Sequence, residues 1–411
     1  MATKLLNSLH WLLIFTLLTA GCLHQYTFTP IPTATFPPTP LPSPSPEATP
    51  PQEISLVVWL PDELFLKGKP GRKALEEEIE AFERNHPLVE VKVYIKKARG
   101  EGGILALLLS AREVAPSVLP DLVVLDAAEA ACVDGDFFQP LGEIPESLFP
   151  FASSGFIYLA ADLDHMVYNT GVVTSPPLSW EEIKRGGGLL LPPSGGMVAA
   201  QYFTMGGRFR NERSELILEE EILAKVLKLW KENMEKGAIP TPSRKLEDPE
   251  EMWKKYLYGK VAMVGVRASL FLASRERLHQ TAFAPLPSAA PVAWGWVAGV
   301  ISREHERKKA AEALVKWLLL PERNQRWTLA ANLLPVHREA YAQEEDAYLL
   351  FLSRLLESAY PAPPSTLLKL LEEALRNVLE GKATPEEAAH KAAKAIPQLY
   401  PDALEKRTKR W

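Results

Sequence analysis

The sequence contains very little cysteine. Of its 411 residues only Cys22 and Cys132 are cysteines, too few for the disulfide framework of a small secreted domain. It also lacks an excess of positive charge, because 46 Lys and Arg stand against 51 Asp and Glu, for a formal net charge of −5. The basic residues are scattered and form no stripe that would bind a phosphate backbone. We therefore expect no nucleic-acid partner.

Recognisable catalytic motifs are also missing. The chain has no G-x-S-x-G nucleophile turn, no H-E-x-x-H zinc motif and no G-x-x-x-x-G-K-[ST] phosphate loop. The stretch "DLDH" (162–165) offers two carboxylates and a histidine. On a strand, Asp162 and Asp164 would share one face and His165 the other, which disfavours joint metal ligation. We expect no enzyme activity, no catalytic residue, no metal and no cofactor.

The N-terminal segment 1–21 has the layout of a secretory signal peptide. Lys4 gives a weakly basic start, an apolar run extends from Trp11 to Ala20, and small residues precede Cys22. The run is shorter than the ~20 residues of a membrane-spanning helix. The sequence "LTAGC" resembles the lipobox of bacterial lipoproteins, which implies cleavage before Cys22 and a diacylglyceryl group on its thiol. The alternative is an ordinary signal peptide with a chance cysteine.

Residues 22–52 then form a predicted Pro/Thr-rich linker. Ten of the 25 residues from 27 to 51 are proline, a composition typical of an extended polyproline spacer of about 80 Å. A recognition motif for a partner domain is the alternative. A lipid group and a spacer together would hold the body at the extracytoplasmic face of the cell membrane. Cys132, left without a partner, is expected to be a small buried apolar residue.

From Glu53 onward the pattern is that of an α/β fold. Strands predicted at 54–60, 89–97 and 121–126 alternate with helices at 72–87 and 102–114, which is the start of a doubly wound sheet. In such sheets ligands bind beyond the carboxyl ends of the strands. Further strands are predicted at 261–266 and 294–302, and further helices at 305–320, 365–381 and 384–396. The length suggests two domains or three.

Taken in order, these segments resemble family-1 extracellular solute-binding proteins of ABC importers, which include maltose-binding lipoproteins. The resemblance spans about 54 to 396 and rests on collinear stretches: "ISLVVW", "ALEEEIEAFERNHPLVEVKV", "LPDLVVLD", "MVYNTG", "PPLSWEEI", "YGKVAMVG", "GWVAGVIS", "AAEALVKWLL", "LLPVHREA" and the helical end of the chain.

The resemblance implies a two-lobe, periplasmic-binding-protein-like fold, with hinge strands and a ligand cleft between two α/β lobes. Lobe one would comprise 53–155 and 283–332, lobe two 156–282 and 333–400, and 401–411 would form a tail. The chain departs from the family pattern before "MVYN", where the usual hinge proline is missing, and at "GGGLLLPPSGG" (186–196), where a long helix is usual. Both departures shorten the expected cleft walls.

The expected ligand site combines aromatic rings with polar side chains, because sugar binders cover apolar ring faces with Trp or Tyr and bind hydroxyls with charged groups. The candidates are Trp59, Asp126, Glu129, Tyr168, Tyr202, Arg267, Trp294 and Trp296. Core packing is the alternative for Trp59, a solvated loop or helix cap for Asp126 and Glu129, and hinge packing for Tyr168. Arg267 stands where relatives often carry Trp. It suggests a more polar ligand, an acidic or phosphorylated sugar, or an ion pair.

These observations predict a monomeric, membrane-anchored receptor that delivers a small solute, a carbohydrate above all, to the permease subunits of an ABC importer. The second hypothesis is a ligand-sensing or degenerate binding lipoprotein that partners a membrane protein without transport. An enzyme built on the same two lobes is a third hypothesis.

Overall fold

The computed structural model describes residues 53–66, 69–133, 137–151, 156–240 and 248–398, all within the unit formed by residues 51–411. The predicted signal peptide, Cys22, the whole linker 22–52 and the tail 401–411 lie outside the described residues. Within the described ranges, no helix is long and apolar enough to cross a membrane.

The larger of two sheets contains the strands predicted for the first lobe. In spatial order these are β2 (Val89–Lys96), β1 (Ile54–Pro61), β3 (Leu122–Asp126), β8 (Val292–Val300) and β4 (Phe156–Asp162), with the short β9 (Tyr360–Pro361) beside β8. β1 runs parallel to β2 and β3, whereas β8 runs antiparallel to β3 and β4. The predicted β-α-β-α-β start is confirmed.

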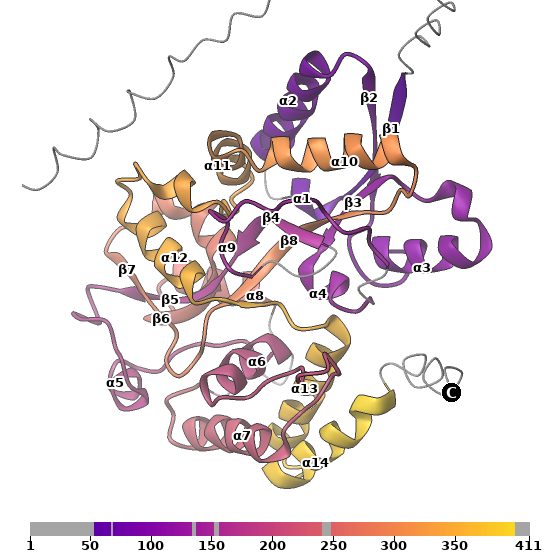
Figure 1. The fold of residues 1–411 in the computed structure, drawn as a ribbon. Helices are drawn as coiled ribbons and strands as arrows, with labels where there is room; N and C mark the ends of the chain where they lie inside the picture. The colour runs from indigo at the N-terminus through magenta and orange to yellow at the C-terminus, as the bar shows by residue number, and fades with distance from the viewer. Residues whose placement is uncertain (1–52, 67–68, 134–136, 152–155, 241–247, 399–411) are drawn as a thin grey trace, which may run out of the picture. The chain divides into compact units, whose positions relative to one another are not determined.

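The middle of this sheet is buried, which explains its composition. Every residue of β3 and of β8 is buried, and apart from Asp126 at the end of β3 both strands are apolar, as expected where helices or loops cover both faces of a sheet. α2 (Lys69–Asn85), α10 (His305–Leu318) and α11 (Pro321–Ala330) pack together against it (Figure 1). α3 (Ile104–Val114) follows β2, and the short α4 (Ala127–Ala130) follows β3.

The smaller sheet has the antiparallel order β6 (Met263–Arg267), β5 (Asp164–Asn169), β7 (Thr281–Ala284). Side chains alternate along β5 as a strand requires. Val167 belongs to the core shared with the larger sheet, whereas Met166 and Tyr168 belong to a second core. Against the first face pack α8 (Pro249–Leu257), α9 (Ala268–Leu272) and α12 (Ala347–Glu357).

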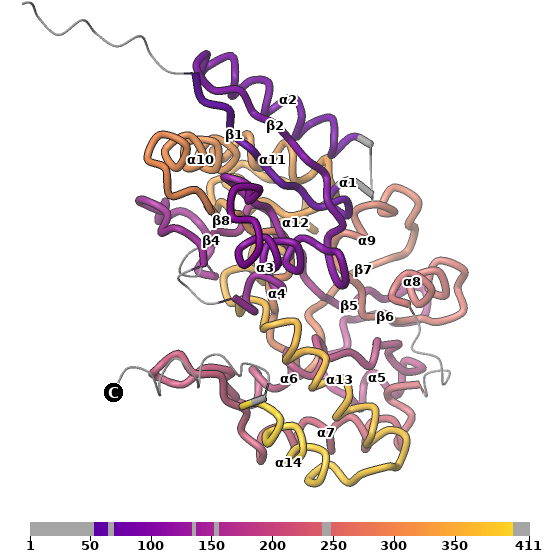
Figure 2. Tube along the Cα trace, turned by 90° about the vertical axis from the view of Figure 1, so that its right-hand side faces the viewer, coloured from indigo at the N-terminus to yellow at the C-terminus, as the bar shows by residue number. Residues whose placement is uncertain are grey.

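The second core is formed by helices that lie beyond the smaller sheet. They are α5 (Trp180–Arg185), α6 (Gly195–Thr204), α7 (Glu220–Glu235), α13 (Ser365–Leu379) and α14 (Pro385–Ala395). Figures 1 and 2 both show α6, α7, α13 and α14 grouped together. A capping box between Ser179 and Glu182 starts α5, and another between Thr384 and Glu387 starts α14.

The chain leaves or enters the larger sheet at three places, twice from or to the smaller sheet and once toward the helices of the second core. β4 and β5 are separated only by Leu163, residues 285–291 lead from β7 to β8, and the third passage leads from α12 through β9 to α13. The Tyr158 hydroxyl links β8 to the third passage, because it donates to the Ala293 carbonyl at 2.9 Å and accepts from the Ala362 amide at 3.1 Å. The first passage thus lies after β4, whereas the sequence-based boundary at 155/156 lies before it.

Cys132 differs from expectation. It is partly exposed rather than buried, so the prediction of a buried apolar cysteine is wrong. Its thiol donates to the Ala128 carbonyl at 3.4 Å and lies 3.4 Å from the hydroxyl of Ser365 at the start of α13. The polar surroundings explain the difference, because α4 and α13 approach each other here through small and hydroxyl-bearing residues.

Candidate functional site

A cavity of about 730 Å³ lies where the two sheets meet. It is lined by the carboxyl end of β3, the β4–β5 passage, the end of β6, the start of β8, and the N-terminal ends of α6 and α8. Parallel β1, β2 and β3 all end at this edge of the larger sheet, which is where α/β sheets bind ligands. The cavity thus occupies the place that the strand order predicts for a site.

Trp294 on β8 is the centre of one group of side chains in the cavity wall. Its indole N–H donates to Asp164 Oδ2 on β5 at 2.7 Å, and Arg267 Nε on β6 donates to Asp164 Oδ1 at 3.1 Å. The Arg267 guanidinium lies over the Trp294 ring, 4.6 Å from its centroid. The carboxylate therefore fixes both the orientation of the indole and the charge above it.

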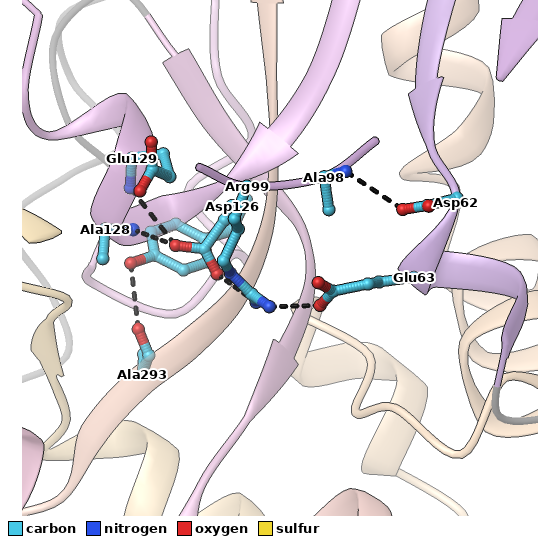
Figure 3. Close-up of polar contacts among 9 residues, drawn as sticks. Asp62, Glu63, Ala98, Arg99, Asp126, Ala128, Glu129 and Ala293 are labelled. Atoms are coloured by element: carbon cyan, nitrogen blue, oxygen red, sulfur yellow. Dashed lines mark hydrogen bonds and ion pairs between the residues drawn. The ribbon is translucent and has the colours of Figure 1, made fainter. Parts of the chain in front are cut away.

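Trp296, two residues further along β8, has a similar environment built from other parts of the chain. The Arg99 guanidinium lies 5.4 Å from the Trp296 ring centroid. Its Nη2 donates to Asp126 Oδ2 at 2.7 Å, and its Nη1 pairs with Glu63. Figure 3 shows Arg99 between these two carboxylates. Burial alone would lower the pKa of Arg99, but the neighbouring Asp126 and Glu63 outweigh it and raise that pKa.

Asp126 has a second role that explains its position. It is the N-cap of α4, and its Oδ1 accepts from the Ala128 amide at 2.9 Å and the Glu129 amide at 3.2 Å (Figure 3). One oxygen thus caps the helix while the other binds Arg99. Asp126 pairs with Trp296 in the antiparallel β3–β8 ladder, so the sheet itself places carboxylate and indole side by side.

Gly295 stands between the two tryptophans, and its backbone requires glycine. Its φ is +136°, and a Cβ built on it would lie 2.1 Å from the Ala160 carbonyl oxygen. Opposite it, the β4–β8 register shifts between Tyr158 and Ala160. Residues two positions apart on a strand face the same side of the sheet, and Trp294 and Trp296, on either side of Gly295, both reach the cavity.

The DLDH segment divides as the strand pattern predicts. Asp162 and Asp164 both line the cavity, whereas His165 is fully buried and lies 3.1 Å from the Tyr348 hydroxyl through Nε2. The Asp162 Oδ1 accepts from the Leu163 amide and the Ser269 amide, each at 3.0 Å. Burial lowers the pKa of His165 to about 3. In the described part of the chain, no group of three His, Cys, Asp or Glu is placed to hold a metal ion.

Four of the eight candidate ligand residues line the cavity: Asp126, Arg267, Trp294 and Trp296. Asp126 and Arg267 end β3 and β6, and Trp294 and Trp296 lie in the first five residues of β8. The ion-pair alternative for Arg267 is the one that the structure contains, because its guanidinium is bound to Asp164. Whether these residues contact a ligand stays a prediction.

Trp59 and Glu129 do not line the cavity. Trp59 is 8% exposed and belongs to the core, with the Lys96 ammonium 5.2 Å from its ring centroid. Core packing, the alternative for this residue, therefore describes its surroundings. Glu129 is partly exposed on α4, and its contact with Asp126 is made by its backbone amide.

Tyr168 and Tyr202 also lie away from the cavity wall, in the second core. Tyr202 on α6 is fully buried, stacks on Phe209 at 4.6 Å and places its hydroxyl 3.1 Å from Glu219 Oε2. Burial raises the pKa of both tyrosines. Both side chains point into a packed interior, so they support the helices behind the site.

Sequence reasoning missed Arg99 and Asp164 as site residues. Arg99 follows the carboxyl end of β2, which lies beside β1 in the sheet. The rule that parallel strands end at one edge applies to all three strands and would have found it. Asp164 was weighed only as a metal ligand, because its partners Trp294 and Arg267 are 130 and 103 residues away along the chain.

The sequence of this chain matches the family model of bacterial extracellular solute-binding proteins over residues 79–348. The chain belongs to this family. The resemblance identified from the sequence is thus confirmed, and the family implies an extracytoplasmic location. No curated protein has a sequence similar enough to match this solute-binding protein.

Solved structures confirm the two-lobe fold. MalE, a sugar-binding protein from Xanthomonas citri, matches with a TM-score of 0.70 and 16% identity over 86% of this chain and 98% of that one. The GacH receptor of Streptomyces glaucescens, solved unliganded and with acarbose, matches with a TM-score of 0.68 and 19% identity, over 86% of this chain and 100% of that one. A maltose/maltodextrin-binding domain from Bdellovibrio bacteriovorus, bound to maltotriose, matches with a TM-score of 0.63 and 18% identity, over 85% of this chain and 100% of that one.

Proposed function

We propose that this solute-binding protein binds a small carbohydrate in the 730 Å³ cavity and delivers it to the permease subunits of an ABC importer. The observation that carries the proposal is the pair of indoles, Trp294 and Trp296, set on one strand among carboxylates and guanidinium groups. Indole surfaces cover the C–H patches of a sugar, and charged groups bind its hydroxyls.

The size of the cavity supports a small ligand, because pockets for small molecules measure about 300–1,000 Å³. The polar groups around the indoles are fixed by one another, as Asp164 is by Arg267 and Asp126 by Arg99. A sugar of the wrong configuration would leave some of them unpaired, at about 1–3 kcal/mol each. Related folds that bind acarbose or maltotriose support the same ligand class.

The proposed role involves no covalent chemistry. The tightly paired carboxylates and guanidinium groups of the wall are suited to hydrogen bonding, and binding energy would stabilise a more closed arrangement of the lobes that the passages between the sheets allow. The importer would then recognise that arrangement.

The proposal includes a lipid anchor at Cys22 and a spacer at residues 27–51, supported by the lipobox-like sequence before Cys22. A Cys22→Ser variant should then leave the membrane fraction, because an acidic body has little other affinity for lipid. Detergent partitioning of labelled cells measures this, with Cys132→Ser as the matched control. Equal membrane association of wild type and Cys22→Ser would contradict the anchor.

Binding itself is tested with the full chain in detergent by differential scanning fluorimetry against sugars, polyols, amines and oligopeptides. We expect the melting temperature to rise with a carbohydrate and not with the other classes, since a ligand that binds only the folded state stabilises it. A shift with oligopeptides alone would contradict the carbohydrate proposal. Uptake of the identified sugar in cells that lack this chain separates an import receptor from a sensor.

A further inference from the structure

A second cavity lies beside the first, where the passages of the chain meet. It has a volume of about 150 Å³. It is lined by Asp164 at the start of β5, by the 285–291 passage and the start of β8, by α6, and by Leu355 of α12 with Ser358 just after that helix. Residues within or next to all three passages therefore contribute to it. We call this space the hinge cavity.

The lining of the hinge cavity is apolar apart from two residues. Among its described residues, only Asp164 and Ser358 carry a polar side chain. The Asp164 carboxylate accepts hydrogen bonds from Trp294 and Arg267. The Ser358 hydroxyl donates to the Leu355 carbonyl at 3.3 Å. An apolar occupant would therefore leave neither side chain unpaired, whereas a polar occupant would find few partners for its own groups.

The hinge cavity and the 730 Å³ cavity have two lining residues in common, Asp164 and Met197. These two residues thus stand between the two spaces. Asp164 is held in place by its hydrogen bonds to Trp294 and Arg267, whereas Met197 is an unbranched thioether with three rotatable bonds. Displacement of the Met197 side chain would join the two spaces, and a ligand in the larger cavity would then extend into the hinge cavity.

The size of the hinge cavity suits a small hydrocarbon group. An apolar cavity of about 150 Å³ holds a molecule of the size of benzene. Met197, Ala200 and Leu286 are all buried, so a group placed among them is removed from water. Pro285 and Ser358 are exposed, so the far end of the cavity is open to solvent. A longer group would extend into water there and gain little.

We propose that the ligand is a glycoside with a small apolar aglycone. Its sugar binds in the 730 Å³ cavity beside Trp294, and its aglycone enters the hinge cavity past Met197. The inference rests on the carbohydrate function proposed above and adds the class of the non-sugar group. The Trp294 indole is bound to Asp164 at 2.7 Å, so a sugar on this indole lies next to the opening. An aglycone in the hinge cavity also contacts the passages about which the lobes would close.

The experiment measures affinities of the full chain, in a detergent without a sugar head group, for glucosides, galactosides, mannosides and maltosides of both anomeric forms. Each is supplied as the free sugar and as the methyl, propyl, phenyl and glyceryl glycoside. In one series the propyl form should bind about tenfold more tightly than the methyl form, because each buried methylene strengthens binding about three- to fourfold. The phenyl form should bind at least as tightly as the propyl form. The glyceryl form, which has the length of propyl but carries two hydroxyls, should lose the advantage.

Two substitutions should change the ratio of propyl to methyl affinity in opposite directions. Ala290 lines the hinge cavity, and Ala290→Leu should lower the ratio to about one, because the added side chain occupies the space for the propyl group. Met197→Ala should raise the ratio about threefold, since the aglycone no longer displaces this side chain. A general change in the hinge affects both ligands alike and cancels in the ratio. Ala342→Leu, exposed and outside both cavities, is the matched control and should leave the ratio unchanged.

The outcomes separate the aglycone inference from the function on which it rests. If a sugar binds but its propyl and phenyl glycosides bind no more tightly than the methyl glycoside, the aglycone inference is overturned and the carbohydrate function stands. If neither the free sugars nor any glycoside binds, the carbohydrate function is overturned. A propyl preference that Ala290→Leu and Met197→Ala leave unchanged would also contradict the proposal, because the alkyl group would then be buried elsewhere.

Discussion

The indole N–H of Trp294 and the carboxylate of Asp164, 2.7 Å apart, form a hydrogen bond between the two sheets. Trp294 lies near the start of β8 in the larger sheet, whereas Asp164 is the first residue of β5 in the smaller one. The same carboxylate binds Arg267 on β6. The Asp164 carboxylate thus orients two other side chains in a cavity wall that is built from both sheets.

Replacing Asp164 by Asn should weaken ligand binding about tenfold and reduce stability by about 1.5–3 kcal/mol, the range for a hydrogen bond to a charged group. The amide keeps the shape but loses the charge that holds Arg267 over the indole. Calorimetry and urea unfolding measure the two effects. Glu357→Gln, which breaks the exposed pair with Arg338, is the control and should bind ligand normally. Unchanged affinity of Asp164→Asn would show that the wall does not need this carboxylate.

Trp296→Ala should reduce affinity at least tenfold, because it removes an indole of the cavity wall and the surface on which Arg99 rests. Truncation of an aromatic side chain that is 6% exposed also costs about 3–5 kcal/mol of stability. Affinity is therefore measured by calorimetry at a temperature where circular dichroism shows the folded state. Trp180→Ala on α5, outside the cavity wall, is the control. Equal ligand affinities of Trp296→Ala and Trp180→Ala would show that Trp296 does not contribute to ligand binding.

Strands and helices were largely predictable, because their apolar patterns are local. The buried runs at β3 and β8 and the capping boxes of α5 and α14 each appear in a few consecutive residues. Side-chain direction was less predictable. Tyr202 was expected at the cleft, but the helical period of α6 turns it into the second core.

Trp59 shows that side-chain direction was also hard to predict on a strand. It stands at the correct end of β1, yet its side chain belongs to the core. The groups that organise the site were the hardest to predict. Asp164, Trp294 and Arg267 come from three strands, β5, β8 and β6. Their contact depends on how the sheets meet, which no local pattern encodes.

Gly295→Ala should destabilise the protein by more than about 3 kcal/mol, since its φ of +136° is open essentially to glycine alone and an added Cβ would meet the Ala160 carbonyl. It should also weaken binding, because β8 must shift under both tryptophans. Gly259→Ala is the matched control, with φ of +68° and open space around the added Cβ. It should cost about 1–2 kcal/mol. If urea unfolding showed the same loss of stability for Gly295→Ala and Gly259→Ala, that result would contradict the tight approach of β4 and β8.

Stability should fall in mild acid because of His165. Burial lowers its pKa to about 3 in the folded state, below the unfolded value of about 6.5. The unfolded state therefore binds the extra proton first, and stability is lost as the pH falls below 6.5 toward 3. Lowering the pH from 7.5 to 5 should remove about 2 kcal/mol through this group.

The comparison of wild type with His165→Gln isolates that contribution. Burial also lowers the pKa of His337, so the pH dependence of the wild type alone combines both groups. Urea unfolding at both pH values should show a smaller pH effect in His165→Gln than in the wild type. His305→Gln, an exposed substitution on α10, should keep the full effect. Parallel pH curves for all three proteins would contradict a buried neutral His165.

The single residue Leu163 between β4 and β5 has a mechanical consequence. Its side chain is fully buried, its amide donates to Asp162, and its carbonyl accepts from the Ala268 amide at 2.8 Å. We therefore expect a rotation of one sheet against the other to pivot close to Leu163. Atoms near the pivot travel least, so Asp162 and Asp164 would stay almost fixed while α7 and α14 sweep the longest arc. The deepest part of the cavity would thus have the same geometry before and after closure, and closure would be seen mainly as a displacement of α7 and α14.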